Sequence, residues 1–321
     1  MKTAFKRVIG PIVGVVLFAA AAWTIWRALR EHGVDEIIDA VRGLPPARLL
    51  AAGGVAVLCY ALLAAYDALG FRYLRRRPPL GRVLLGGFVG YAMSNSVGSS
   101  VISGGAARQR LYAPLGLSLV ELSALVAFCS LTYWLGFSTL AGLALVIDPP
   151  PLPDEVGLPR DTLRLVGAGV WVPLLVWGTW SFIGHKPVHF GGVDFRVPPF
   201  RITLAQILIA TVELAISGYL FYLIMPPAPG WGYFQILGLF LVAQIAGFLS
   251  FIPGGLGVFD TIILLALGPA AGEPQVVAGL LAYRVIYHLI PLALGAAALI
   301  THEWHARRRG RRQAVVASSR A

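Results

Sequence analysis

The chain has 321 residues, of which 57% are hydrophobic and only 13% are charged, and its formal net charge is +11. A soluble protein of this length could not bury so much apolar surface, so the composition excludes that class and predicts an all-α polytopic membrane protein. The basic residues stand in short blocks beside apolar stretches, which is typical of cytoplasmic loops that face anionic lipids and argues against a nucleic-acid partner.

About eight apolar stretches are predicted to span the membrane. The first follows Lys2, Lys6 and Arg7, and its apolar run of about 19 residues is longer than the apolar part of a signal peptide. We therefore expect it to be retained as a helix that starts in the cytoplasm. In chain order the stretches are 8–29, 49–71, 83–102, 117–147, 163–183, 202–225, 233–251 and 275–300.

The loops between these stretches give the predicted sidedness. The loop 72–82 carries five arginines and is the strongest cytoplasmic marker in the chain. The loop 148–161 is acidic and rich in proline, so we expect it outside, whereas the basic loop 184–201 is expected inside. Residues 1–306 are thus predicted to form a single integral membrane domain, and residues 307–321 a basic cytoplasmic tail.

Two glycine-rich stretches interrupt the apolar pattern 150 positions apart, and laying Gly104-Gly105 on Gly254-Gly255 also aligns the apolar runs before them. Broken backbone inside a bilayer is tolerated only where protein buries it or where it lines a wet cavity. We therefore predict two short broken or re-entrant half-helices, within the elements 83–116 and 233–271, that form an inverted internal repeat around a transporter's binding site. The predicted hinge positions are Gly104, Gly105, Pro253, Gly254, Gly255 and Gly257.

Six charged residues fall at or near membrane depth, where one charge costs about 2.5–3.5 kcal/mol on insertion scales. Each therefore needs a partner or a wet pocket, which leaves two readings open: structural ion pairs, or a substrate-binding site. The six candidates are Asp67, Arg108, Arg110, Glu213, Asp260 and Arg284.

The local context favours different readings for different charges. Asp67 is near the inner end of its predicted span and close to Arg72, so an interfacial carboxylate explains it. Asp260 opens a short helix, where a carboxylate also acts as a cap. Glu213 and Arg284 lie deep in their spans, where a functional role is the default expectation. The predicted supporting residues around Arg284 are Tyr283, Tyr287 and His288.

No catalytic signature occurs in the sequence. It contains no nucleophile elbow, no P-loop, no HExxH motif and no Cys or His pair at metal-ligand spacing. We therefore expect a membrane transporter that is not an enzyme and needs no cofactor or metal.

Three motifs carry a family resemblance: Gly104-Gly-Ala-Ala-Arg-Gln-Arg-Leu-Tyr112, Pro253-Gly-Gly-Leu-Gly-Val-Phe-Asp260 and Tyr283-Arg-Val-Ile-Tyr-His-Leu-Ile-Pro291. Together they resemble the membrane flippase domain of MprF, the lysyl-phosphatidylglycerol synthase/flippase of bacteria, which also occurs alone in YbhN-like inner-membrane proteins. The likeness covers about residues 8 to 300. It implies a multi-pass protein of the bacterial inner membrane, with both termini cytoplasmic, that moves a phospholipid or related polar lipid between leaflets. The residues to which it implies a role in flipping are Asp67, Arg108, Glu213, Asp260 and Arg284.

Three functions follow from these observations. In the first, a lipid translocase, Arg108, Arg110 and Arg284 bind the lipid phosphate, and Glu213 and Asp260 neutralise them or bind a cationic headgroup. The second is a secondary transporter of a small anionic or zwitterionic solute. The third is a non-transporting scaffold for a lipid-modifying enzyme. Because the chain ends at Ala321, we expect no synthase domain, and the expected partners are membrane phospholipids and a separate lipid-modifying synthase.

Overall fold

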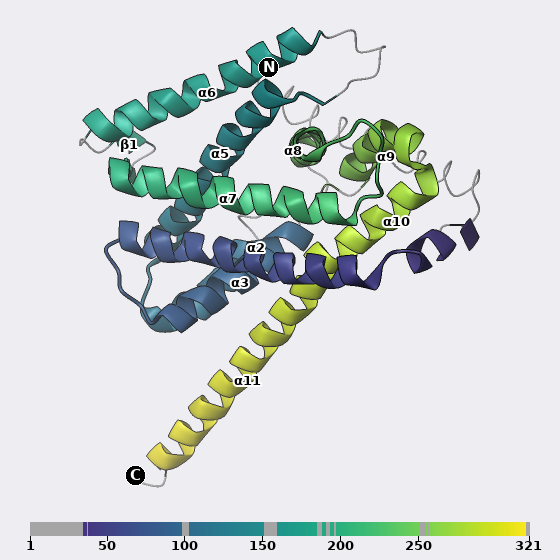
Figure 1. The fold of residues 1–321 in the computed structure, drawn as a ribbon. Helices are drawn as coiled ribbons and strands as arrows, with labels where there is room; N and C mark the ends of the chain where they lie inside the picture. The colour runs from purple at the N-terminus through teal and green to yellow at the C-terminus, as the bar shows by residue number, and fades with distance from the viewer. Residues whose placement is uncertain are drawn as a thin grey trace, which may run out of the picture.

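The computed structural model describes residues 35–36, 38–97, 103–150, 159–184, 188–190, 193–195, 197–250, 255 and 257–318. The first predicted span, 8–29, lies outside the described residues. Nearly everything described is helical, which confirms the all-α class (Figure 1). The exception is an antiparallel hairpin of β1 (Val188–Phe190) and β2 (Val193–Phe195), where the sequence predicted only a loop.

Helices of very different lengths build the bundle. In chain order they are α2 (Pro46–Tyr73), α3 (Leu80–Val97), α4 (Ser103–Tyr112), the short turn η1 (Ala113–Leu115), α5 (Leu119–Ile147), α6 (Arg160–Ile183), α7 (Phe200–Ile224), α8 (Tyr233–Leu249), α9 (Val258–Ala271), α10 (Glu273–Tyr283), the π-helix η4 (Arg284–Leu289) and α11 (Ile290–Ser318). α11 runs on to Ser318, so the predicted basic tail continues the last helix.

Five of the described helices are long and apolar enough to cross a membrane: α2, α5, α6, α7 and the continuous helix Glu273–His302. α8 and α9 are shorter apolar helices. The outer faces carry many exposed apolar side chains, and α6 is the clearest case, with Leu175 and Phe182 both exposed. Because such a surface is stable only against lipid or another apolar partner, the chain is a multi-pass membrane protein.

Side-chain contacts fix the direction of α2 relative to α5. Asp67 on α2 contacts Cys129 on α5, and Gly70, one turn further along α2, packs against Leu125, one turn earlier on α5. Along the contact, the residue numbers increase on α2 and decrease on α5, so the two helices are antiparallel. The basic loop after α2 therefore lies at the same end of the bundle as the start of α5.

α7 runs parallel to α5. Gln206 on α7 donates a hydrogen bond to Thr132 on α5, and Ala210, one turn on, packs against Gly136. α2 and α7 are therefore antiparallel, as their colouring in Figure 1 also shows. This arrangement is what an inverted repeat requires, because α2 and α7 occupy corresponding positions when the chain is shifted by the 150 residues of the Gly-Gly alignment.

α3 and α4 form an antiparallel helical hairpin. Gly104 near the start of α4 packs on Ser94 near the end of α3, and the hydroxyl oxygen of Tyr112 at the end of α4 lies 2.9 Å from the carbonyl oxygen of Val83 at the start of α3. The two open ends of this hairpin thus lie together. Phe71, at the end of α2, stacks edge-on against Tyr112, so that end is also the one with the basic loop.

α8 and α9 form a second hairpin that opens toward the opposite end. Gly247 on α8 packs against Gly255, just before α9, and Phe240 lies with its ring 5.8 Å from that of Phe259 on α9. The side chain of Gln235, at the start of α8, donates to Asp148 at the end of α5. The two hairpins therefore enter the bundle from opposite ends.

Local sequence signals set the helix ends that frame these hairpins. Gly116, with φ of +68°, lets the chain reverse between α4 and α5. α5 then begins with a capping box, in which Ser118 and Glu121 exchange side-chain and backbone hydrogen bonds. Gly257, with φ of +82°, is the N-cap of α9, and the carboxylate of Asp260 accepts a hydrogen bond from its N–H. The predicted capping role of Asp260 is therefore present.

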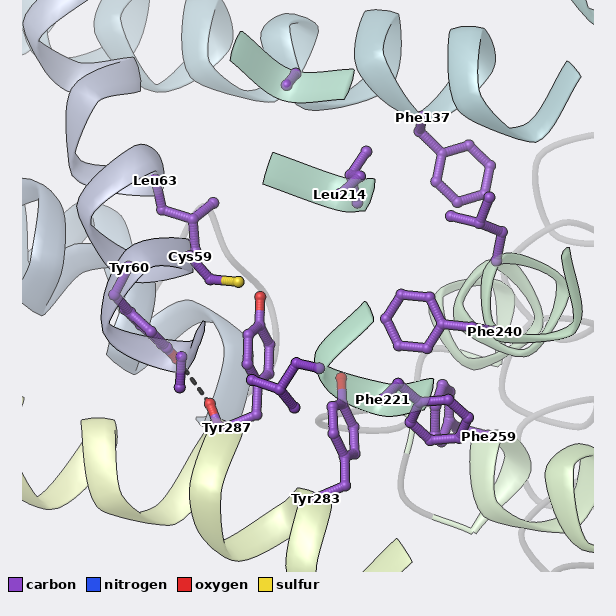
Figure 2. Close-up of a cluster of buried hydrophobic side chains, with 14 of the residues drawn as sticks. Cys59, Tyr60, Leu63, Phe137, Leu214, Phe221, Phe240, Phe259, Tyr283 and Tyr287 are labelled. Carbon is purple, nitrogen blue, oxygen red and sulfur yellow. Dashed lines mark hydrogen bonds between the residues drawn. The ribbon is translucent and has the colours of Figure 1, made fainter. Parts of the chain in front are cut away.

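An aromatic cluster holds the second hairpin against the last helix (Figure 2). The ring of Phe221 on α7 stands perpendicular to that of Tyr283, 5.2 Å away, and is tilted against Phe240. Tyr283 stacks between Phe259 on one side and Tyr287 on the other, at 5.7 and 5.4 Å. Aromatic pairs of this kind add about 0.5–1.5 kcal/mol each beyond the area that they bury.

Candidate functional site

The first buried ion pair joins α2 to α4. Arg108 donates through Nε to Oδ2 of Asp67 at 2.8 Å and through Nη2 to Oδ1 at 2.9 Å. The Tyr112 hydroxyl donates to the same carboxylate at 2.7 Å, and the Cys129 thiol lies 3.4 Å from it. The two side chains are 3% and 0% exposed, so this pair is closed to solvent and lipid. A bidentate pair with further donors is the geometry that a buried charge needs.

Small residues on α3 make room for this pair. A Cβ at Gly90 would lie 2.7 Å from Cζ of Arg108, a Cβ at Gly86 would overlap the ring of Tyr112, and Gly104 packs directly on Ser94. The spacing of Gly86, Gly90 and Ser94 is four residues each time, which places all three on one helix face. This small-residue stripe is what allows α4 to approach α3 closely.

The second ion pair lies at the start of α9 and is more accessible. Arg284 donates through Nη2 to Oδ2 of Asp260 at 2.9 Å and through Nε to Oδ1 at 3.3 Å. The Arg284 and Asp260 side chains remain 14% and 15% exposed, respectively. The guanidinium also lies over the ring of Phe259, 5.5 Å from its centroid. This pair can therefore be reached by a ligand, whereas the Asp67–Arg108 pair cannot.

Glu213 lies deep in α7, and its carboxylate is held by two tyrosines. The Tyr66 hydroxyl donates to Oε2 at 3.3 Å and the Tyr287 hydroxyl to Oε1 at 3.4 Å. Glu213 is 1% exposed, and within the described part of the chain no salt bridge reaches it. Along the same helix, Oε1 of Gln206 and Oγ of Ser217 are also buried, without a partner among the described residues. A polar ligand or water is the usual partner of such atoms.

A π-helix connects Glu213 to the second ion pair. It begins at Arg284 and includes Tyr287, which donates to Glu213 through its hydroxyl and accepts a 3.0 Å hydrogen bond from Tyr60 on its carbonyl (Figure 2). Single turns of π-helix are frequent at functional sites. Because Arg284 and Tyr287 lie on the same π-helical turn, a change in its winding would move both the ion pair and the partner of Glu213.

The structure gives Asp67 a partner that the sequence did not indicate. Its side chain is completely buried and paired with Arg108. The reason is tertiary: α4 folds back along α3 and brings Arg108 to a carboxylate 41 positions earlier in the chain. The reading as a structural ion pair therefore describes its contacts.

The remaining predicted site residues are placed as follows. Arg110 is exposed, and since it stands two positions from Arg108 it points to another face of α4 than the buried pair does. The His288 ring lies edge-on to Tyr283 and Tyr287, with centroids 5.3 Å away in both cases. Gly104 and Gly105 are within α4, and Gly255 and Gly257 adopt positive φ. Pro253 and Gly254 lie outside the described residues.

Sequence reasoning missed Tyr66, Tyr112 and Cys129 as partners of the buried carboxylates. Tyrosines and cysteines in apolar spans resemble ordinary core residues, so only the fold reveals them. The four-residue spacing of Gly86, Gly90 and Ser94 is the one signal that could have pointed to the helix–helix contact. Among the described residues, no group of three or more His, Cys, Asp or Glu is arranged to hold a metal ion.

Comparisons with known proteins agree on the membrane region. The family described as "Lysylphosphatidylglycerol synthase TM region" matches residues 11–295. An uncharacterized protein of Synechocystis is 35% identical over 94% of both chains, and the inner membrane protein YbhN of Escherichia coli is 32% identical over 81% of both. A phosphatidylglycerol lysyltransferase of Staphylococcus haemolyticus is 24% identical over 88% of this chain but only 33% of its own length.

Proposed function

This chain belongs to the lysylphosphatidylglycerol synthase TM region family, and from that premise we propose that it is a lipid translocase rather than an enzyme. It moves the headgroup of a phospholipid or related polar lipid between leaflets, while the acyl chains stay in the bilayer. In this proposal the chain lies in the bacterial inner membrane with both termini in the cytoplasm, and a separate synthase modifies the lipid.

One observation carries the proposal: each helical hairpin supplies one member of a charged pair, and the two hairpins open toward opposite ends of the bundle. Arg108 of the α3–α4 hairpin pairs with Asp67 on α2, Asp260 of the α8–α9 hairpin pairs with Arg284 on the π-helix, and the carboxylate of Glu213 accepts hydrogen bonds from Tyr66 on α2 and Tyr287 on the π-helix. We propose that both hairpins are re-entrant in the membrane. Transporters built from inverted repeats bind substrate where broken helices meet, and this position suits a headgroup that must leave one leaflet for the other.

The second ion pair is the proposed phosphate site. Its partial exposure allows a lipid phosphate to compete with Asp260 for the guanidinium of Arg284, and a phosphate offers the same two acceptors as the carboxylate. Asp260 is held in place by its hydrogen bond from the Gly257 N–H, so Arg284 can be released without moving the start of α9. Glu213 then provides an acceptor for the polar or cationic part of the headgroup.

Specific observations also bear on the two alternatives, a scaffold and a transporter of a small solute. The scaffold reading is favoured by the four charges that form two ion pairs, but Glu213 stays buried without a cation among the described residues, at a cost that a scaffold does not require. The reading as a transporter of a small anion or zwitterion is favoured by the deep burial of Glu213, which suits a closed internal site. The many exposed apolar faces are common to all three readings.

Translocation in proteoliposomes tests the proposal. Wild type, Arg284→Ala and Arg164→Ala are reconstituted with fluorescent and native phospholipids, and headgroup movement between leaflets is followed. Arg164 is the matched control, because it forms an exposed pair with Asp161 at 3.0 Å. We expect wild type and Arg164→Ala to translocate lipid, and Arg284→Ala to be slower by about tenfold or more, since a charge-assisted contact is lost.

The result that overturns the proposal is equally clear. If vesicles with the wild-type protein move lipid no faster than empty vesicles, the protein is not a lipid translocase. A solute-uptake assay then distinguishes a transporter of a small solute from a non-transporting scaffold. A folded Arg284→Ala variant with wild-type translocation would show that the Asp260–Arg284 pair is not the phosphate site.

A further inference from the structure

A hollow lined by four arginines lies at the end of α2, outside the buried charges described above. Its volume is about 730 Å³, and the described residues that line it are Arg72, Arg75, Arg76 and Arg77. Pockets that hold small ligands have volumes of roughly 300–1,000 Å³, so this hollow is large enough for a lipid headgroup rather than a bare ion. It lies at the end of the bundle where α2 ends and α5 begins.

The charges around the hollow are only partly neutralised. Arg76 donates through Nε and Nη2 to Glu121 on α5, at 2.9 and 2.7 Å, which ties the loop to the bundle. Within the described ranges of the chain, Arg72, Arg75 and Arg77 have no acidic partner at salt-bridge distance, and all three are exposed. Three guanidiniums therefore face one recess, where each can donate to phosphate oxygens in a fork geometry.

Arg75 adopts a backbone conformation that glycine adopts more readily than arginine. α2 ends in a Schellman motif: the Arg76 N–H bonds to the Phe71 carbonyl at 2.9 Å, and the Arg75 N–H to the Arg72 carbonyl at 3.1 Å. The motif puts Arg75 in the left-handed region, with φ of +55°, and no other described residue except glycine has positive φ. Helices prefer glycine at this position because it has no Cβ. Strain of this kind is a reason to look for a function of the side chain.

Exposed apolar side chains follow the arginines of the hollow in the chain. Arg77 is followed by two prolines and then by Leu80, which is 61% exposed at the start of α3, with Leu84 and Leu85 exposed one turn further on. In a bound lipid, the acyl chains would pack on these leucines and the phosphate would lie among the arginines. A soluble anion would gain nothing from this apolar wall. The combination therefore favours a lipid over a free phosphate.

We propose that the arginine hollow is a binding site for the phosphate-bearing headgroup of an anionic phospholipid in the leaflet on the α2–α3 loop side. This site is separate from the proposed translocation site at Arg284, and it does not require that the protein translocate lipid. A bound lipid would link the end of α2 to the start of α3 and, through Arg76 and Glu121, to α5.

Arg75→Gly is the sharpest variant for a test, because it removes one guanidinium at a position where glycine relieves strain. The purified full-length protein in neutral detergent is titrated with short-chain phosphatidylglycerol, short-chain phosphatidylcholine and inorganic phosphate, and each dissociation constant is measured. We expect phosphatidylglycerol to bind wild type more tightly than the other two. Arg75→Gly should weaken it about fivefold, the effect of one arginine near an anionic headgroup, with no loss of thermal stability.

Arg82→Gln is the matched control, because Arg82 lies in the first turn of α3, close in sequence to the arginines of the hollow, and is exposed but does not line the hollow. An equal loss for Arg82→Gln and Arg75→Gly would overturn the proposal in favour of a diffuse positive field, and so would wild-type affinity in Arg75→Gly. Binding of inorganic phosphate as tight as that of phosphatidylglycerol would overturn the lipid as occupant. If Arg75→Gly fails to fold, Arg77→Gln takes its place with the same expectation.

Combining Arg75→Gly with Arg284→Ala tests this proposal separately from the proposed function. The loss of affinity caused by Arg75→Gly should persist in that background, because the two sites are separate. Its disappearance would show that the lipid measured was bound at Arg284, and the hollow would then not be a site. Raising the salt concentration from 0.1 M to 1 M should also weaken binding at the exposed arginines, since the screening length falls from about 10 to about 3 Å.

Discussion

Arg108 and Asp67 form a bidentate ion pair, with donor–acceptor distances of 2.8 and 2.9 Å, and both side chains are almost completely buried. Asp260 and Arg284 form a similar pair that stays about one-seventh exposed. The difference in burial gives the two pairs different expected roles. The closed pair ties α4 to α2, and in the proposed function the accessible pair opens for substrate.

The first prediction concerns the stability of the closed pair. Asp67→Asn leaves the Arg108 guanidinium buried without an anion, so the free energy of unfolding in detergent should fall by about 3–5 kcal/mol. Asp161→Asn breaks an exposed pair with Arg164 and should lower it by less than about 1 kcal/mol. Denaturant titration followed by tryptophan fluorescence measures both. Equal, small losses would mean that the buried pair contributes no more than a surface pair.

The second prediction compares two adjacent glycines of α4. A Cβ at Gly104 would overlap Ser94 Oγ and lie 2.6 Å from the Gly90 carbonyl, whereas a Cβ at Gly105 meets nothing within 4 Å. Gly104→Ala should therefore lower the free energy of unfolding by about 1–3 kcal/mol. Gly105→Ala should leave it unchanged or raise it by up to about 1 kcal/mol, because alanine is the better helix former. The thermal midpoints of unfolding of the two variants measure this difference. Equal midpoints would contradict the close packing of α4 on α3.

The third prediction concerns Glu213. Glu213→Gln keeps the shape and one carbonyl acceptor for Tyr66 or Tyr287 but removes the charge. Because no cation pairs with Glu213 in the described structure, the fold should be retained, with an unchanged or higher thermal midpoint. Headgroup translocation in proteoliposomes should be lost, while the Asp161→Asn control keeps it. Translocation at the wild-type rate in Glu213→Gln would remove Glu213 from the proposed mechanism.

The fourth prediction concerns the π-helix. Tyr60→Phe removes the hydrogen bond to the carbonyl of Tyr287 but keeps the ring contacts with Phe88 and Tyr287. The free energy of unfolding should fall by about 1 kcal/mol, and by up to about 3 kcal/mol if the carbonyl stays unsatisfied. Tyr219→Phe, at a half-exposed tyrosine of α7, is the control and should change it by less than about 0.5 kcal/mol. If both variants unfold alike, Tyr60 does not support the π-helix.

Much of this architecture could be predicted because it depends on local properties of the sequence. Apolar runs long enough to cross a bilayer identified the long helices, and the sidedness that the basic and proline-rich loops indicate stays a prediction. The two Gly-Gly stretches marked the hairpins, since glycine allows close backbone approach and positive φ, as Gly255 and Gly257 show. The rarity of charge in apolar spans was sufficient to select Glu213 and Arg284.

Only the tertiary structure decided which of these charges meet. Partner choice depends on how α4 folds back on α3 and how the last helix crosses α7, and no pattern of residue types fixes those crossings. For that reason the structure pairs Asp67 with Arg108, and it leaves Arg110 exposed on another face of α4. The strained arginine at position 75 is also a product of the fold, because its left-handed conformation arises from the way α2 ends. The length of the apolar runs determines which segments enter the membrane, whereas side-chain packing between segments far apart in the chain determines which charged and polar groups meet.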